Sequence, residues 1–213
     1  MSCFIALDKF VRQYYQSYLQ RLDEPPRFYA PNQPSECVIK PATEETLVYW
    51  QPVLRSESGS FSNVESALEL QLHSDIAEFY GRYYSGCLLF ESKWGEGELI
   101  QPWNADDFDL LQQNIIGHLM MKRKLKQPLT WFIGVLGDGD IMLTVNNQTG
   151  VVAKEVPGEE QSEVLADSLE AFLEQLTVKV APPNLPAEEV VAAVEHPGIF
   201  ASFKRMWRNL TGR

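Results

Sequence analysis

The chain has 213 residues, of which 45% are hydrophobic and 22% are charged, and its formal net charge at pH 7 is −11. This size fits one domain with an appendage, and the apolar content excludes a chain that is disordered throughout. The acidic balance excludes nucleic acid as the main partner, because phosphate binding depends on a basic surface.

The first fifty residues are expected to form a helix, a Pro-rich loop and a strand. Apolar residues from Phe4 to Leu22 recur at helical spacing, which predicts an amphipathic helix. This helix must end before Pro25-Pro26, because proline supplies no N–H group and restricts the residue before it. We expect the Pro-rich loop to continue through Pro41, and a strand to follow over 46–50.

The next segment is expected to contain a long helix and a hairpin. A Ser/Gly-rich loop over 55–61 precedes Ser62-Asn-Val-Glu65, which has the spacing of a capping box. Apolar residues from Val64 to Tyr83 then predict one long helix. Segments 87–91 and 98–101 are expected to pair as strands around residues 94–97.

The rest of the core is expected to hold two helices and three strands. Asn104 is expected to cap a helix whose C-terminal end carries the basic run Lys122–Lys126, which complements the helix dipole. Strands over 130–136, 141–145 and 150–156 and a core helix marked by Leu165 to Leu176 follow. This order predicts an α+β fold, namely a single domain with a largely antiparallel mixed sheet packed with helices, plus a C-terminal extension.

The composition changes after the last predicted helix. Residues 177–198 contain four prolines and much Ala, Val and Glu, which is typical of a linker. Residues 199–213 combine an apolar helical stripe with four basic residues, which is typical of a helix at a membrane interface. We therefore divide the chain into a domain over 1–176, a linker over 177–198 and a basic amphipathic tail over 199–213.

The sequence offers no catalytic or cofactor-binding motif. Its histidines lack the spacing of a zinc site, and no Walker loop, GxSxG or GxGxxG sequence occurs. The three cysteines are widely spaced and odd in number, which indicates free thiols in a reducing cytoplasm. We expect no enzyme activity, metal, cofactor or small-molecule substrate, and we expect neither a signal peptide nor a membrane span.

Acidic charge is concentrated in two blocks. Residues 44–121 carry thirteen acidic and three basic side chains, and residues 127–198 carry twelve and two. Two basic segments, Lys122–Lys126 and 199–213, carry four positive charges each. An acidic body with a basic end suggests a basic partner near a negatively charged surface, although solubility alone explains an acidic excess equally well.

Several uncommon strings occur in order across residues 4–176. They are Val48–Pro52, Asn63–Glu65 with Ala67-Leu68, Phe79-Tyr80, Gln101 with Trp103, Asp106–Phe108, Gln113–Leu119, Lys124–Lys126 with Pro128, Asn147 with Thr149-Gly150, Leu165-Ala166 with Leu169, and Phe172-Leu173. In combination and at this spacing they resemble the bacterial Syd family, the SecY-interacting proteins.

The resemblance implies a small cytosolic protein that docks on the cytoplasmic loops of the SecY translocon and is not an enzyme. It implies a role in quality control of SecY assembly, and a peripheral location on the cytoplasmic side of the bacterial inner membrane. The implied docking surface is an acidic concave face that meets basic loops. Such complementarity raises association rate and selectivity and weakens with salt.

We expect the acidic face to collect carboxylates from two turns and one helix start. They are Glu91, Glu96 and Glu98 on the hairpin, Asp138 and Asp140 on a later turn, and Asp106, Asp107 and Asp109 at the helix start. Asp106 and Asp107 also have an explanation in the helix dipole. Trp94 and Trp103 are candidate apolar anchors, although a place in the core is the commoner role of such side chains.

The tail is expected to touch the inner-membrane surface beside SecY. Its candidate membrane-contacting residues are Phe200, Phe203, Lys204, Arg205, Trp207 and Arg208. Docking of the tail on the protein's own acidic body and simple disorder are the alternatives.

Two other functions stay open at this point. An inhibitor or immunity-type protein would use the same acidic surface against a basic protein partner. A hydrolase would need two carboxylates that converge in a pocket with shifted pKa values.

Overall fold

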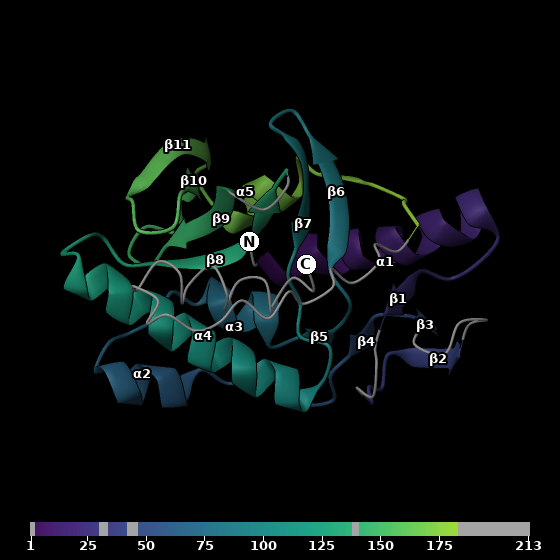
Figure 1. Ribbon diagram of the computed structural model, residues 1–213, viewed down its shortest axis with the longest axis horizontal. Coiled ribbons are helices and arrows are strands. Elements are labelled where there is room, and N and C mark those ends of the chain that lie inside the picture. Colours follow the sequence, from purple (N-terminus) through teal and green to yellow (C-terminus); the bar gives the residue numbers. More distant parts are fainter. Residues whose placement is uncertain (1–2, 30–33, 42–46, 138–140, 183–213) are drawn as a thin grey trace, which may run out of the picture.

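The largest element is a seven-stranded antiparallel sheet with strand order β11-β10-β9-β8-β7-β6-β12 (Figure 1). The computed structural model describes residues 3–29, 34–41, 47–137 and 141–182. The strands of this sheet are β6 (Leu88–Ser92), β7 (Gly95–Leu99), β8 (Thr130–Leu136), β9 (Ile141–Asn146), β10 (Val152–Glu155), β11 (Gln161–Ala166) and β12 (Thr177–Val178). The predicted α+β fold is confirmed, and every pairing between described strands is antiparallel.

Two smaller sheets and five helices complete the described part of the chain. The helices are α1 (Cys3–Leu22), α2 (Ser62–Leu68), α3 (Asp75–Tyr80), α4 (Ala105–Lys124) and α5 (Leu169–Leu173). One small sheet contains β1 (Arg27–Tyr29), β3 (Leu47–Trp50) and β2 (Val38–Pro41), and the other contains β4 (Val53–Leu54) and β5 (Tyr83–Tyr84).

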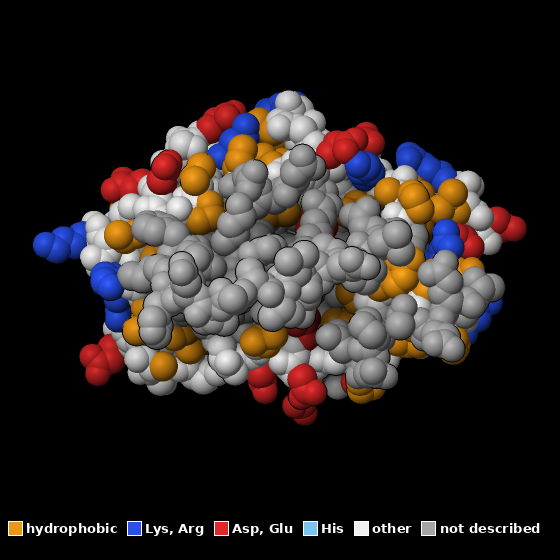
Figure 2. Space-filling view, in the orientation of Figure 1, with side chains coloured by type: hydrophobic (Ala, Val, Ile, Leu, Met, Phe, Trp, Pro, Cys, Tyr) orange, Lys and Arg blue, Asp and Glu red, His pale blue; other side chains and the backbone are white. Residues whose placement is uncertain are grey.

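Helices cover both faces of the main sheet. Side chains of α4 meet Thr130 and Glu155 on one face, with α2 beside α4. On the other face Phe90 contacts Phe172 of α5, and α1 packs against α5 and α3. Figure 2 shows the molecule in the same view, with acidic side chains beside the tip of the β6–β7 hairpin and at the lower edge near the start of α4.

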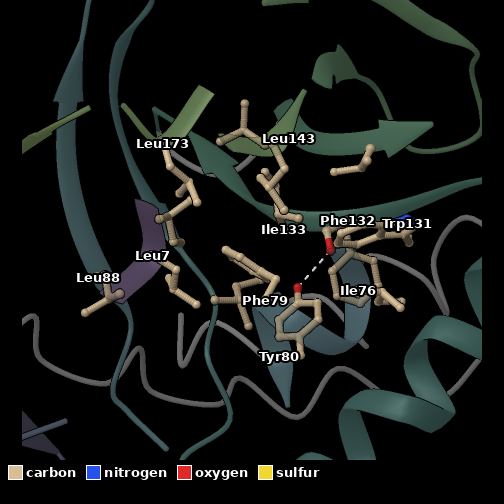
Figure 3. Packing of buried hydrophobic residues seen from close by; sticks show 14 of the residues in the cluster. Leu7, Ile76, Phe79, Tyr80, Leu88, Trp131, Phe132, Ile133, Leu143 and Leu173 are labelled. Atoms are coloured by element: carbon tan, nitrogen blue, oxygen red, sulfur yellow. Dashed lines mark hydrogen bonds between the residues drawn. The ribbon is translucent and has the colours of Figure 1, made fainter. Parts of the chain in front are cut away.

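The main core lies between the sheet and the layer formed by α1, α3 and α5. Figure 3 shows Leu7 of α1 and Leu173 of α5 among the buried side chains of the strands. The hydroxyl of Tyr80 donates to the carbonyl of Phe132 at 2.7 Å, which satisfies the one polar atom of a wholly buried ring. This bond ties α3 to the centre of the sheet.

The predicted long helix from Val64 to Tyr83 is wrong, because the chain turns after α2. Glu69 has a left-handed backbone with φ of 49°, and the amide of Leu70 donates to the carbonyl of Glu65 at 3.1 Å, which closes the helix end. The capping box is also wrong. Phe61 is the N-cap without a side-chain bond, and the Glu65 carboxylate instead accepts from the amide of Leu72.

A side chain from a distant turn holds this interruption in place. The Asn147 amide group accepts a hydrogen bond from the His73 amide and donates one to the Gln71 carbonyl, both at 2.9 Å. Because Asn147 lies between β9 and β10, more than seventy residues along the chain, local apolar spacing carries no sign of the break.

Several short strands were not predicted. The Pro-rich loop contains β1 and β2, which pair with β3, and Leu165 belongs to β11 and not to the last helix. Ser168 caps that helix, since its hydroxyl accepts from the amide of Ala171 at 3.1 Å. Beyond residue 176, β12 pairs with β6, so the sheet continues into the start of the expected linker.

A buried charged network fastens the C-terminal half of α4 to the sheet. Lys122 is wholly buried, its Nζ lies 3.2 Å from Glu155 Oε1, and it donates to the Glu159 carbonyl at 2.7 Å. Glu155 Oε2 accepts from the hydroxyls of Thr130 and Thr144 at 2.8 and 3.1 Å. The expected basic last turn of α4 is confirmed with Lys122, Arg123 and Lys124, and Lys122 in addition forms this buried ion pair.

His118 completes the network in its neutral form. Its Nε2 lies 2.9 Å from Thr130 Oγ1, and that hydroxyl donates to Glu155, so Nε2 carries the proton and donates to Thr130. Burial, aided by the charge of Lys122, lowers the pKa of His118 to about 3. Burial also raises the pKa of Glu155, against the opposite effect of Lys122 and the two threonines.

The first prediction concerns the buried ion pair. Lys122→Met should lower the free energy of unfolding by about 3–5 kcal/mol, because Glu155 would remain buried without its cation. Combining Lys122→Met with Glu155→Gln should cost less than the sum of the two single changes. Urea denaturation measures these differences, and Lys124→Met, at an exposed position of the same helix end, should change stability by less than about 0.5 kcal/mol. Equal losses in the free energy of unfolding from Lys122→Met and Lys124→Met would contradict the stabilising role of the buried ion pair.

The second prediction concerns pH. In the unfolded chain His118 titrates near its usual value of about 6.5, whereas in the folded protein its pKa is about 3. Between these values the unfolded state binds the extra proton, so the free energy of unfolding should fall with falling pH, by up to about 1.4 kcal/mol per pH unit.

Glu155 should partly oppose this trend from about pH 4.5 upwards, because its raised pKa makes the folded state take up a proton before the unfolded state does. Denaturation curves across this pH range should lose the His118 contribution in His118→Gln and keep it in His73→Gln. An unchanged slope in His118→Gln would refute the assignment.

Candidate partner-binding surface

The β6–β7 hairpin places its three carboxylates on one face of the sheet. Ser92 pairs with Gly95, which leaves a two-residue turn, and Gly95 takes a φ of 119° that favours glycine. In this register Glu91 stands opposite Glu96, and Leu89 stands opposite Glu98. Directly opposed residues of antiparallel strands project to the same side, so the three carboxylates share a face. The predicted hairpin is confirmed.

This face is the one on which α4 packs. The register continues from Glu98 to Val135, from Val135 to Met142 and from Met142 to Glu155, which makes one row across four strands. Glu155 contacts Lys122 of α4. The hairpin carboxylates therefore lie on the α4 side of the sheet, towards the edge formed by β6 and β12.

The three hairpin carboxylates differ in exposure and partners. Glu91 and Glu96 are exposed, whereas Glu98 is only 4% exposed. Glu96 forms an ion pair with Lys179, which follows β12. Sequence reasoning missed this pair, because only the pairing of β12 with β6 brings the two residues together.

The carboxylates at the start of α4 differ in their structural roles. The expected cap is confirmed, since the Asn104 side chain accepts from the amide of Asp107 at 2.8 Å. The Asp107 carboxylate accepts from the amide of Trp103 at 2.7 Å, and burial raises its pKa. Asp106 and Asp109 are exposed and available to a partner.

The structure does not unite these carboxylates with those of the hairpin. The hairpin tip lies at the top of the molecule and the start of α4 at the bottom in the view of Figure 1. Asp138 and Asp140 lie outside the described residues, as do all the candidate membrane-contacting residues of the tail. Of the candidate hairpin carboxylates, Glu91 and Glu96 are exposed and share one face of the sheet.

The two candidate tryptophan anchors have internal roles. Trp103 is 3% exposed and packs against Phe28 and Trp50, with ring centroids at 4.9 and 6.2 Å. Trp94 is half-buried at the hairpin turn and stacks on Phe172 at 5.6 Å. Trp103 is therefore core, and Trp94 fastens the hairpin to α5.

One group among the described residues has the composition of a metal site. The ligand atoms of Cys3, Asp75 and Glu78 lie within 4.8 Å of one another. Two contacts give this group a structural explanation, because Glu78 accepts from the amide of Phe4 and the Cys3 thiol lies 3.7 Å from the Asp75 carbonyl. Burial raises the pKa of Cys3, which disfavours the thiolate that a metal would need.

In the described part of the chain, no helix combines the length and the hydrophobicity needed to cross a membrane.

Comparison with known proteins identifies one family. A family model described as "Syd protein (SUKH-2)" matches residues 4–178. "Protein Syd" of Shewanella sp. (strain W3-18-1) is 58% identical over 215 residues, and "Protein Syd" of Shewanella halifaxensis (strain HAW-EB4) is 55% identical over 213. Each alignment covers 100% of both chains, so it includes the C-terminal residues beyond the family match.

Proposed function

Because the chain belongs to the Syd family, we propose that it is an adaptor that binds the basic cytoplasmic loops of the SecY translocon. It acts in quality control of SecY assembly, is not an enzyme, and works at the cytoplasmic side of the bacterial inner membrane. The docking surface is the hairpin face on the α4 side of the sheet.

The observation that carries this proposal is the placement of Glu91 and Glu96. They are opposite each other in register and exposed, and they project to one side of a rigid sheet. Fixed carboxylates of this kind steer a basic loop towards the sheet edge and select against acidic partners. Asp106 and Asp109 are exposed at the start of α4, apart from the hairpin, and add to the negative charge that attracts a basic partner.

Binding to SecY should depend on these charges and on salt. Glu91→Gln combined with Glu96→Gln should weaken binding to SecY-containing membranes about 3- to 30-fold at low salt. This range corresponds to about 0.3–1 kcal/mol for each exposed charge. Raising salt from about 50 mM to about 500 mM should weaken wild-type binding and shrink the difference between wild type and variant. Co-sedimentation over a range of membrane concentrations measures both effects.

The matched control is Glu159→Gln combined with Glu160→Gln. It removes the same charge from exposed positions beside β11, at the opposite edge of the sheet. The control should bind like wild type. No binding by the wild-type protein at low salt, or equal losses in the two double variants, would reject the proposed surface.

The chain's C-terminal part supports a second contact. The domain, which includes β12, and the remainder of the expected linker up to residue 198 would present the basic amphipathic tail to the inner-membrane surface. Four basic residues would each contribute about 1 kcal/mol near an anionic leaflet, and the apolar stripe would add burial at the interface.

Liposome co-sedimentation tests the tail. The full chain should bind vesicles that contain anionic lipid, and a chain ending at Gly198 should not, because it lacks the basic and aromatic residues. Full-chain binding should drop on vesicles of neutral lipid alone. Equal binding by the two chains would remove the membrane contact from the proposal.

A further inference from the structure

Arg55, which follows β4, forms no ion pair with any carboxylate in the described part of this acidic protein. Its guanidinium carbon lies 4.5 Å from the ring centroid of Tyr84 and 4.6 Å from that of Phe108. Its Nη1 is buried and has no hydrogen-bond partner among the described residues. A buried guanidinium N–H without an acceptor raises the free energy of the folded state. An acceptor that arrives from outside the chain would remove this penalty.

The side chain lines a pocket of about 410 Å³ between the loop over 55–63 and the first half of α4. Ser58, Ser60 and Asn63 contribute polar groups to its wall, and Phe108 contributes an apolar one. Glu57 and Asp109 also line the pocket, although neither forms an ion pair with Arg55 among the described contacts.

The pocket is held in shape by its own hydrogen bonds. The amide of Gly59 donates to the Gly81 carbonyl at 2.8 Å, and the Gln112 side chain donates to the Ser60 carbonyl at 2.9 Å. A β-carbon on Gly59 would lie 2.6 Å from Arg55 Nη1 and 2.6 Å from the Phe108 ring. Gly59 therefore lets the loop backbone lie close to the guanidinium and the Phe108 ring, and any side chain at this position would displace them.

We infer that this pocket binds a carboxylate group through Arg55. A planar guanidinium matches a carboxylate in a two-point hydrogen bond, and Nη1 of Arg55 has no acceptor among the described residues. Nearby hydroxyl and amide groups can donate further bonds, and the faces of Tyr84 and Phe108 suit the methylene stem of an acidic side chain. Glu57 and Asp109 oppose a doubly charged phosphate more strongly than a singly charged carboxylate.

The carboxylate could belong to an acidic residue of a docked polypeptide or to a free organic acid. Two probes separate these sources, namely N-acetyl-glutamate N-methylamide, which mimics a residue in a chain, and propionate. We expect the blocked glutamate to bind with a Kd of about 1–10 mM, as one hydrogen-bonded charge pair allows. The blocked glutamine should not bind. Binding of propionate with equal affinity would assign the pocket to free acids, and weaker binding would assign it to polypeptides.

NMR titration of the full chain provides the measurement, through the Arg55 side-chain Nε–H signal and the Gly59 amide signal. Arg55→Lys should weaken binding about tenfold, because lysine keeps the positive charge but cannot donate two parallel hydrogen bonds to a carboxylate. Arg55→Gln should abolish binding, because it removes the charge as well. Arg82→Gln removes another ring-stacked arginine, which lies 4.2 Å from the Phe4 ring, and should leave binding unchanged.

Asp109→Asn supplies an independent test that does not alter Arg55. Removing a negative charge from the pocket wall should raise the affinity for the blocked glutamate about two- to fivefold. No saturable shift up to about 50 mM of either probe, well above the expected Kd, would overturn the inference. Undiminished binding by Arg55→Gln, or unchanged affinity in Asp109→Asn, would overturn it as well.

Discussion

The buried ion pair between Lys122 and Glu155 is the constraint on which the rest of the structure depends. It joins α4 to β10 inside the protein, with Lys122 beside Oε1 of Glu155 and the hydroxyls of Thr130 and Thr144 donating to Oε2. Removing two charges from water is expensive, so such a pair persists only where the geometry is good and the remaining donors and acceptors are satisfied. This one fixes both the depth and the direction of α4 on the sheet.

The direction of α4 determines what the protein can present to a partner. Its C-terminal half packs on β8 and reaches Glu155 of β10, whereas Glu91 and Glu96 of the hairpin are exposed on the same face of the sheet. Its N-terminal half carries Phe108 and Asp109 and forms a wall of the Arg55 pocket. One helix therefore contributes both to the buried network at its C-terminal end and to the pocket of Arg55 at its N-terminal end.

The sequence predicts the features that depend on neighbouring residues. The Asn104 cap, the hairpin and the strand over 130–136 follow from spacing within a few residues, and all three are confirmed. The break at Glu69, the strand β12 and the burial of Lys122 each depend on a residue far along the chain, namely Asn147, a residue of β6 and Glu155. A lysine at a helix end looks the same in sequence whether it meets water or a buried carboxylate. Similarly, a list of acidic residues does not tell exposed Glu91 from buried Glu98.

Site-specific photo-crosslinking in SecY-containing membranes tests the central claim most directly, because it reports proximity without changing charge. A photoreactive residue at Thr177, which is exposed and stands opposite Glu91, should crosslink to SecY. The same residue at Val164, which is 59% exposed on β11 at the far edge of the sheet, should not. Crosslinks from Val164 with none from Thr177 would contradict the claim that the hairpin face is the docking surface.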